Sequence, residues 1–275
     1  MGLGVQLITV FWGICILQSV TALAGGLGCL KCHDSHYENK GTCIDCHRGN
    51  PRTDRLLIAH HDLIGAPYAH FTMEGSPVSQ RGCALVTISG CRRCHVLDGK
   101  GRPCAANLDK VFGAARPQKL FDAIKTPAFF MPDFCFKDTD IIALVNAILT
   151  KATLGESKAG EVPLVIHFED EEQAEERVFG QHCGSCHKVL TTHFGGLGKG
   201  NIGPNLSGLF SEYYPTTDGD KEPWSPKSLE SWLENPRKIR KNAQMPPVIL
   251  TSDGFFRLLE ILGATTFAVN EERET

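Results

Sequence analysis

The sequence predicts a mainly α fold, in which a loop-rich N-terminal module precedes two small all-α domains. Two observations predict this organisation. The pentapeptide Cys-x-x-Cys-His occurs four times, twice close together near the N-terminus and once in each later part of the chain. The same series of features follows both the third and the fourth copy: a helical segment, a Met-Pro pair and a final amphipathic helix. The 275 residues are therefore expected to form three modules, whereas length alone suggests roughly two domains.

The composition excludes several classes of protein. With 42% hydrophobic and 21% charged residues, the chain is neither a disordered polyelectrolyte nor a membrane protein with many spans. Its 28 basic and 31 acidic residues give a formal net charge of -3. Because nucleic-acid binding requires a clear basic excess, we expect no nucleic-acid partner.

Residues 1–24 have the pattern of a signal peptide. A mostly apolar run from Leu7 to Val20 is followed by an A-x-A cleavage pattern that ends at Ala24. The run is shorter than the roughly 20 apolar residues that a membrane-spanning helix needs. We expect cleavage after Ala24 and export to a bacterial periplasm. The alternative is an uncleaved membrane anchor from Leu3 to Leu27.

Eight of the 12 cysteines belong to the four pentapeptides. Residues at i and i+3 share one helical face, so both sulfurs of a pair can form thioethers to one haem, and the adjacent histidine can bind its iron. Zinc sites also use Cys-x-x-Cys pairs, and the first two pairs have the spacing of a zinc ribbon, but zinc does not require a histidine after each pair. We therefore expect four covalently bound haem c groups. Their attachment residues are Cys29, Cys32, His33, Cys43, Cys46, His47, Cys91, Cys94, His95, Cys183, Cys186 and His187.

The module at 25–81 carries the first two motifs, which begin 14 positions apart. This spacing places the two haems close together. A short helix over 59–65 is expected to return over them. Since histidines outnumber methionines in this stretch, we expect a second histidine on each iron. The candidates are His36 and one of His60 or His61, with His70 in reserve.

The domain at 82–150 is a reduced copy of the longer pattern. It has a helical segment at 120–124, Met131 followed by proline, and an amphipathic helix that opens at Asp138. Met131 is the expected second ligand of the His95 haem, 36 residues further along the chain. The domain has no clean Gly-Pro-x-Leu loop, so the sequence leaves open which carbonyl accepts a hydrogen bond from His95.

Three cysteines lie outside the motifs in or beside this domain. They are Cys83, Cys104 and Cys135. In an oxidising compartment a module with so small a core favours a disulfide, and we expect one among these three. The sequence does not select the pair.

A linker at 151–171, with His167, leads to the C-terminal domain at 172–275. After its motif come Gly203-Pro204-Asn205-Leu206, a helix at 225–233, Met245-Pro246 and a last amphipathic helix that opens at 251–253. The stretch 172–266 resembles a class I cytochrome c domain. The resemblance implies that His187 and Met245 are the two iron ligands and that the carbonyl of Pro204 accepts a hydrogen bond from the His187 ring. We expect His182 and His193 to be non-ligands.

The four motifs together resemble those of multihaem c-type cytochromes, in which a C-H-x-x-H arrangement like that of His33 and His36 often supplies a ligand to a neighbouring haem. The available ligands are sufficient for every iron, and haem catalysis needs an open position, so the count favours an electron carrier over an enzyme. A methionine ligand raises the haem potential. Electrons are therefore expected to pass from the N-terminal pair toward the C-terminal domain.

The resemblance implies a periplasmic tetrahaem cytochrome of an anaerobic respiratory chain. Its electron donor would be a quinol-oxidising membrane complex or another cytochrome, and its acceptor a terminal reductase or outer-membrane conduit. Peripheral contact with a membrane is left open. The alternative is a haem-dependent terminal reductase of peroxide, or of a metal or metalloid oxyanion such as selenite, with one open haem site. The sequence selects neither the physiological partners nor the oligomeric state.

Overall fold

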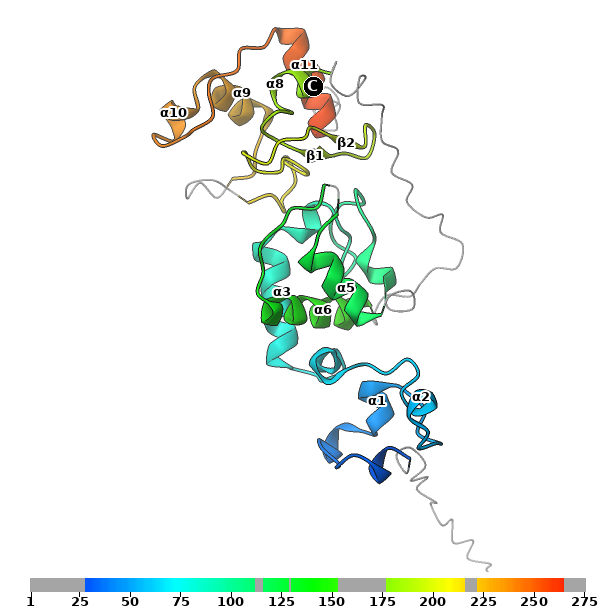
Figure 1. The fold of residues 1–275 in the computed structure, drawn as a ribbon. Helices are drawn as coiled ribbons and strands as arrows, with labels where there is room; N and C mark the ends of the chain where they lie inside the picture. The colour runs from blue at the N-terminus through cyan, green and yellow to red at the C-terminus, as the bar shows by residue number, and fades with distance from the viewer. Residues whose placement is uncertain (1–27, 112–115, 129, 153–176, 216–221, 265–275) are drawn as a thin grey trace, which may run out of the picture. The chain divides into compact units, whose positions relative to one another are not determined.

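The computed structural model describes residues 28–111, 116–128, 130–152, 177–215 and 222–264, and it divides the chain into two units, 1–63 and 64–275 (Figure 1). The predicted signal peptide, most of the predicted linker and His167 lie outside the described residues. Helices dominate the described residues, with one short two-stranded sheet, so the predicted mainly α class is confirmed. Among these residues no helix is both long and apolar enough to cross a membrane.

The first unit consists of short helical turns: η1 (Cys29–Lys31), η2 (Glu38–Lys40), α1 (Cys43–His47) and α2 (Leu56–Ala59). Asp45 begins α1 by accepting hydrogen bonds from the backbone N–H and the hydroxyl of Thr42, at 2.7 and 2.8 Å. These bonds hold the pKa of the Asp45 carboxyl below its usual value. The helix expected over 59–65 lies earlier in the chain, because α2 ends at Ala59 and Asp62 adopts a left-handed backbone with φ of 57°.

Two crossing helices, α3 (Pro77–Ile88) and α6 (Asp138–Ala152), form the centre of the first part of the second unit, with α5 (Pro117–Lys125) beside them (Figure 1). The helices expected at 120–124 and from Asp138 are thus present as α5 and α6. A β-carbon on Gly82 would overlap the backbone carbonyl of Ala143, so glycine permits the close approach of α3 and α6. The remaining elements here are η4 (Cys91–Arg93) and η5 (Leu108–Lys110).

The 3-10 helix η3 (Ala66–Thr72) packs on α6 although we expected its residues to belong to the preceding module. The buried Asn146 side chain joins the two elements. Its Oδ1 accepts the backbone N–H of Phe71 at 2.9 Å, and its Nδ2 donates to the carbonyl of Pro67 at 2.8 Å. The packing of this unit therefore begins near residue 64 and not at 82.

The last part of the unit contains α8 (Val178–His182), the antiparallel pair β1 (Val189–Leu190) and β2 (Gly196–Leu197), α9 (Pro226–Glu234), α10 (Pro236–Ile239) and α11 (Ser252–Leu262). The two helices expected here are present, each with its own cap. The Ser225 hydroxyl accepts the Ser228 N–H, and the Thr251 hydroxyl accepts the Gly254 N–H. Phe179 and Leu258 lie at the centre of a continuous apolar core between α8 and α11.

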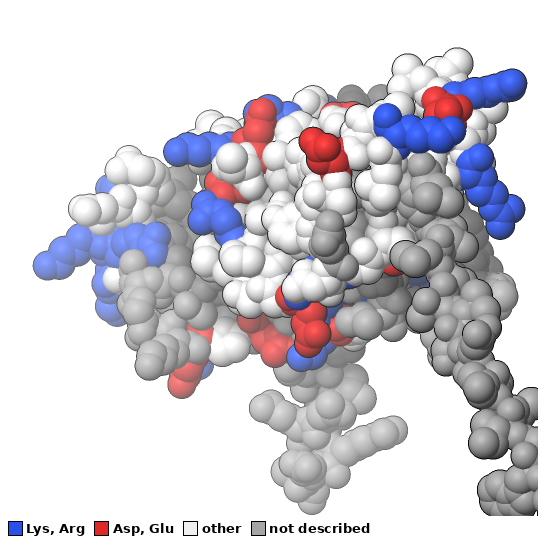
Figure 2. Space-filling view, turned by 90° about the horizontal axis from the view of Figure 1, so that it is seen from below, with Lys and Arg blue, Asp and Glu red and all other residues white. Residues whose placement is uncertain are grey.

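Charged side chains of both signs occur on the face shown in Figure 2, with uncharged residues between them. The small formal net charge of -3 agrees with this mixed surface. Neither observation provides the basic excess that nucleic-acid binding requires.

Candidate functional site

All four pentapeptides fold as a turn of helix. The backbone N–H of the histidine donates to the carbonyl of the first cysteine at 3.0 Å in the first copy, 3.0 Å in the third and 2.9 Å in the fourth. The second copy forms the whole of α1. Residues at i and i+3 of such a turn share one face, so both sulfurs of each pair point to the same side. Attachment to one haem requires this arrangement.

In the first unit the structure brings four histidines together in two pairs. The ring centroids of His36 and His47 are 5.7 Å apart, and those of His33 and His60 are 6.0 Å apart. An imidazole nitrogen lies roughly 2 Å from a metal that it binds, so each separation leaves room for an iron between the rings. His61 instead places its Nδ1 3.2 Å from the carboxylate of Asp62. Of the two alternatives, His60 is the one beside a motif histidine.

His70, the reserve ligand, lies in η3 of the second unit. Its backbone carbonyl accepts a hydrogen bond from the Ser79 hydroxyl, and its Nδ1 lies 3.5 Å from the hydroxyl of Ser76. These contacts tie His70 to the start of α3.

A cavity of about 180 Å³ contains the third motif and the methionine predicted to pair with it. Cys91, Cys94, His95 and Met131 all line the cavity. The His95 Nδ1 lies 2.8 Å from the carbonyl of Ala106, which fixes the ring and leaves Nε2 as the nitrogen available to a metal. The cavity thus has the thiols, the imidazole and the thioether that a covalently attached haem needs.

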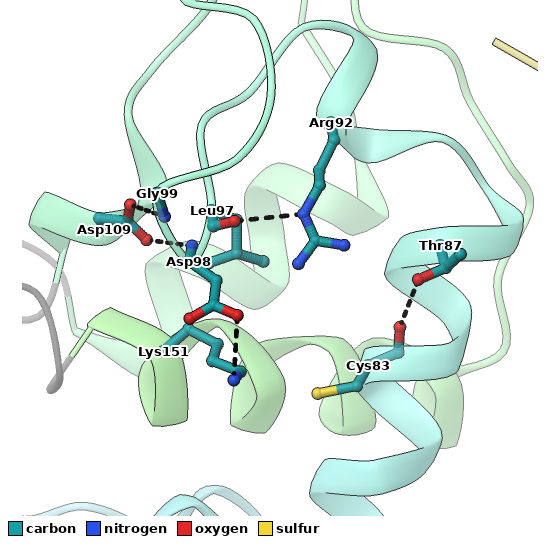
Figure 3. A network of polar contacts seen from close by, with 8 residues as sticks. All are labelled: Cys83, Thr87, Arg92, Leu97, Asp98, Gly99, Asp109 and Lys151. Carbon is teal, nitrogen blue, oxygen red and sulfur yellow. Dashed lines mark hydrogen bonds and ion pairs between the residues drawn. The ribbon is translucent and has the colours of Figure 1, made fainter. Parts of the chain in front are cut away.

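The loop after His95 is held by the carboxylate of Asp109 (Figure 3). The carboxylate accepts the backbone N–H of Asp98 at 2.6 Å and that of Gly99 at 2.9 Å. Asp98 in turn forms an ion pair with Lys151 of α6 at 3.2 Å. These contacts fasten the loop to the helix that closes this part of the unit.

The fourth motif has the hydrogen bond that its resemblance implies. Nδ1 of the buried His187 lies 2.8 Å from the carbonyl of Pro204. Met245 packs against the apolar core that includes Cys183, and its sulfur accepts a hydrogen bond from the Trp232 indole N–H at 3.2 Å. The expected non-ligands His182 and His193 are both exposed.

The loops that hold the His95 and His187 rings follow the same pattern, although only the second contains Gly-Pro. In each, the residue that accepts the ring N–H is followed by Asn-Leu, and the leucine N–H donates to the residue directly after the motif histidine. These bonds are Leu108 to Val96 at 2.9 Å and Leu206 to Lys188 at 2.8 Å. Ala106 is therefore the carbonyl partner of His95 that the sequence left open.

Burial controls the charge of several groups in these sites. It lowers the pKa of His95, which keeps the imidazole neutral as metal binding requires. Desolvation also raises the pKa of the Cys94 thiol to about 11 and that of the Cys183 thiol to about 11. In the unmodified chain both cysteines are therefore neutral thiols at physiological pH.

The expected disulfide among the three remaining cysteines is absent, since every described cysteine is free. Cys104 is buried, whereas Cys135 is exposed. Cys83 lies in α3, where its carbonyl accepts the Thr87 hydroxyl within the helix (Figure 3). The described cysteines therefore supply no cross-link to this small core.

A cytochrome c of Stellaria longipes matches 78 residues of the chain with 35% identity. The match covers 25% of this chain and 67% of that protein. No family model matches the chain, and no solved structure does so either. The similarity therefore covers about one domain's length, and the properties common to cytochromes c are covalent haem and electron transfer.

Proposed function

The chain belongs to the cytochrome c family, and from this premise we propose that it is a tetrahaem electron carrier of an anaerobic respiratory chain. Covalently bound haem c and electron transfer follow from the family. The number of haems, their ligands and the route of the electrons are the proposal.

The observation that supports the proposal is a candidate second iron ligand for each motif. His47 and His33 each have a histidine ring 6.0 Å away or closer, and His95 shares a cavity with Met131. Met245 packs on the core next to the fourth motif. An iron with two protein ligands has no position for a substrate, which favours electron transfer over catalysis.

Haem c, when bound, supplies an iron that takes up and releases one electron. The protein's part is to hold the ligands still. Carbonyls of Ala106 and Pro204 fix the rings of His95 and His187, and core packing holds Met245. Ligands fixed in this way keep the same positions in both oxidation states, so little reorganisation accompanies each transfer.

The proposed location is a bacterial periplasm, reached with a signal peptide cleaved after Ala24. The proposed partners are redox proteins: a quinol-oxidising complex or another cytochrome as donor, and a terminal reductase or outer-membrane conduit as acceptor. The four Cys-x-x-Cys-His motifs support this location, because haem attachment and an apolar N-terminal segment both accord with export.

Two measurements on the purified holoprotein test the proposal. A pyridine haemochrome assay with intact-mass spectrometry counts the haems, and we expect four. An electron paramagnetic resonance spectrum of the oxidised protein should contain only low-spin ferric signals. A substantial high-spin signal would instead favour the reductase alternative, and fewer than four haems would refute the tetrahaem assignment.

A further inference from the structure

Arg93, which lies between the two cysteines of the third motif, contacts the loop that holds His187. Arg93 is only 8% exposed, and its Nη1 donates to the backbone carbonyl of Asn205 at 3.0 Å. Its guanidinium lies 5.3 Å from the ring centroid of Tyr214, whose hydroxyl donates to the same Asn205 carbonyl at 3.2 Å. Two donors thus converge on the residue that follows Pro204.

The side chain of Asn205 makes a second connection between these segments. Its Nδ2 donates to the carbonyl of Phe130 at 2.9 Å, and Phe130 directly precedes Met131. Its Oδ1 accepts the Ser207 N–H at 3.0 Å, which fixes the amide orientation. On the other side, the Pro204 carbonyl accepts the His187 ring N–H.

Two glycines allow the segments to approach closely. A β-carbon on Gly196 would overlap the ring of Phe130, and one on Gly208 would lie 2.7 Å from the carbonyl oxygen of Arg93. Gly208 also has φ of +68°, a conformation that favours glycine. The contact therefore depends on small residues from both β2 and the His187 loop, as a packed interface does.

We infer that Asn205 links the two single-haem sites into one electron-transfer unit. The route runs from the His187 ring through Pro204 and Asn205 to the Phe130 carbonyl and Met131, and it contains only covalent bonds and two hydrogen bonds. Tunnelling decays less steeply along bonds than across van der Waals gaps, so Asn205 is a positioning residue for this step. With haem bound at both sites, one site would be oxidised by one electron and the other reduced by one, with no bond made or broken.

The inference rests on the proposed function, and Asn205→Asp tests it separately. The substitution keeps the oxygen that accepts the Ser207 N–H but replaces the Nδ2 donor with an oxygen facing the Phe130 carbonyl. The matched control is Asn107→Asp, because Asn107 occupies the same loop position beside Ala106 and its Oδ1 accepts the Asp109 N–H at 2.9 Å. Haem content and low-spin signals, which report the proposed function, should be unchanged in both variants.

Two measurements report on the contact between Asn205 and Phe130. Hydrogen exchange of the backbone amides at 91–95 and 205–208 should accelerate by about twofold to 13-fold in Asn205→Asp, the effect of losing one part-buried hydrogen bond. Flash photolysis should show slower electron transfer between the two sites. Asn107→Asp should change neither readout. Equal effects in both variants, or faster exchange at 205–208 alone, would overturn the inference.

Gly196→Ala provides an independent test from the opposite side of the contact. The added methyl would displace the Phe130 ring, which lines the same cavity as Cys91 and Cys94, so exchange at 91–95 should accelerate and transfer should slow as in Asn205→Asp. Gly65→Ala is the control, because its methyl would meet nothing closer than the Pro67 ring at 3.9 Å. Unchanged transfer in Gly196→Ala would contradict the proposed route.

Discussion

Replacing Asn146 with leucine should destabilise the second unit more than any surface substitution. Asn146 is completely buried in α6 and makes three side-chain hydrogen bonds, to the Phe71 N–H at 2.9 Å, the Pro67 carbonyl at 2.8 Å and the Ile142 carbonyl at 2.9 Å. The first two reach η3 and so attach it to α6. Leucine has the same branching and number of heavy atoms and removes every one of these bonds.

The structure sets the size of the effect. The bond to the Ile142 carbonyl lies within α6, so the substitution removes the two hydrogen bonds that join η3 to α6. Each of these two hydrogen bonds contributes about 0.5–1.5 kcal/mol, which gives a loss of about 1–3 kcal/mol. For a unit of this size each kcal/mol lowers Tm by about 2–4 °C. We expect Tm to fall by about 2–12 °C.

Thermal unfolding of the holoprotein, followed by far-ultraviolet circular dichroism, measures this change. Asn201→Leu is the control, because Asn201 is exposed and its substitution should shift stability by less than about 0.5 kcal/mol. If Asn146→Leu were as stable as Asn201→Leu, the attachment of η3 to α6 through this amide would be refuted.

Three further predictions concern the sites and the core. Met245→Ala should lower the potential of one haem and leave its attachment intact, so redox titration should change while the haemochrome count does not. Gly82→Ala should cost about 1–3 kcal/mol in urea unfolding, since its methyl overlaps the Ala143 carbonyl; an unchanged midpoint would argue against the close helix crossing. Burial raises the pKa of Tyr214, with Arg93 opposing the shift. The folded state therefore retains a proton that the unfolded state releases, so stability should fall as pH rises above about 10, and less steeply in Tyr214→Phe.

The sequence was sufficient to predict the attachment turns and the helices that carry them. Each Cys-x-x-Cys-His segment encodes its own turn through local hydrogen bonds, so no distant contact is needed to form it. The caps at Ser225 and Thr251 and the proline after Met245 are likewise local signals. The hydrogen bond from His187 to Pro204 could be inferred because Gly-Pro-x-Leu is a recognisable loop.

Long-range contacts account for what the sequence did not predict. Nothing local distinguishes His60 from His61, and only the position of α2 in the first unit sets His60 beside His33. The packing of η3 on α6 includes a hydrogen bond from Phe71 to an amide 75 residues away. The expected disulfide is absent among the described cysteines, and the burial of Cys104 and the exposure of Cys135 depend on tertiary packing that the sequence does not reveal.

The two histidine loops show how a repeated element can acquire a second role. Asn107 and Asn205 occupy equivalent positions, and each uses Oδ1 to accept the N–H two residues later. Only Asn205 also donates to a carbonyl next to a predicted ligand of the other site. Because the Oδ1 bond alone suffices to shape the loop, Nδ2 is free to serve the contact between sites. An aspartate would satisfy the first role and abolish the second, so at Asn205 the choice of asparagine over aspartate is explained by the contact and not by the loop.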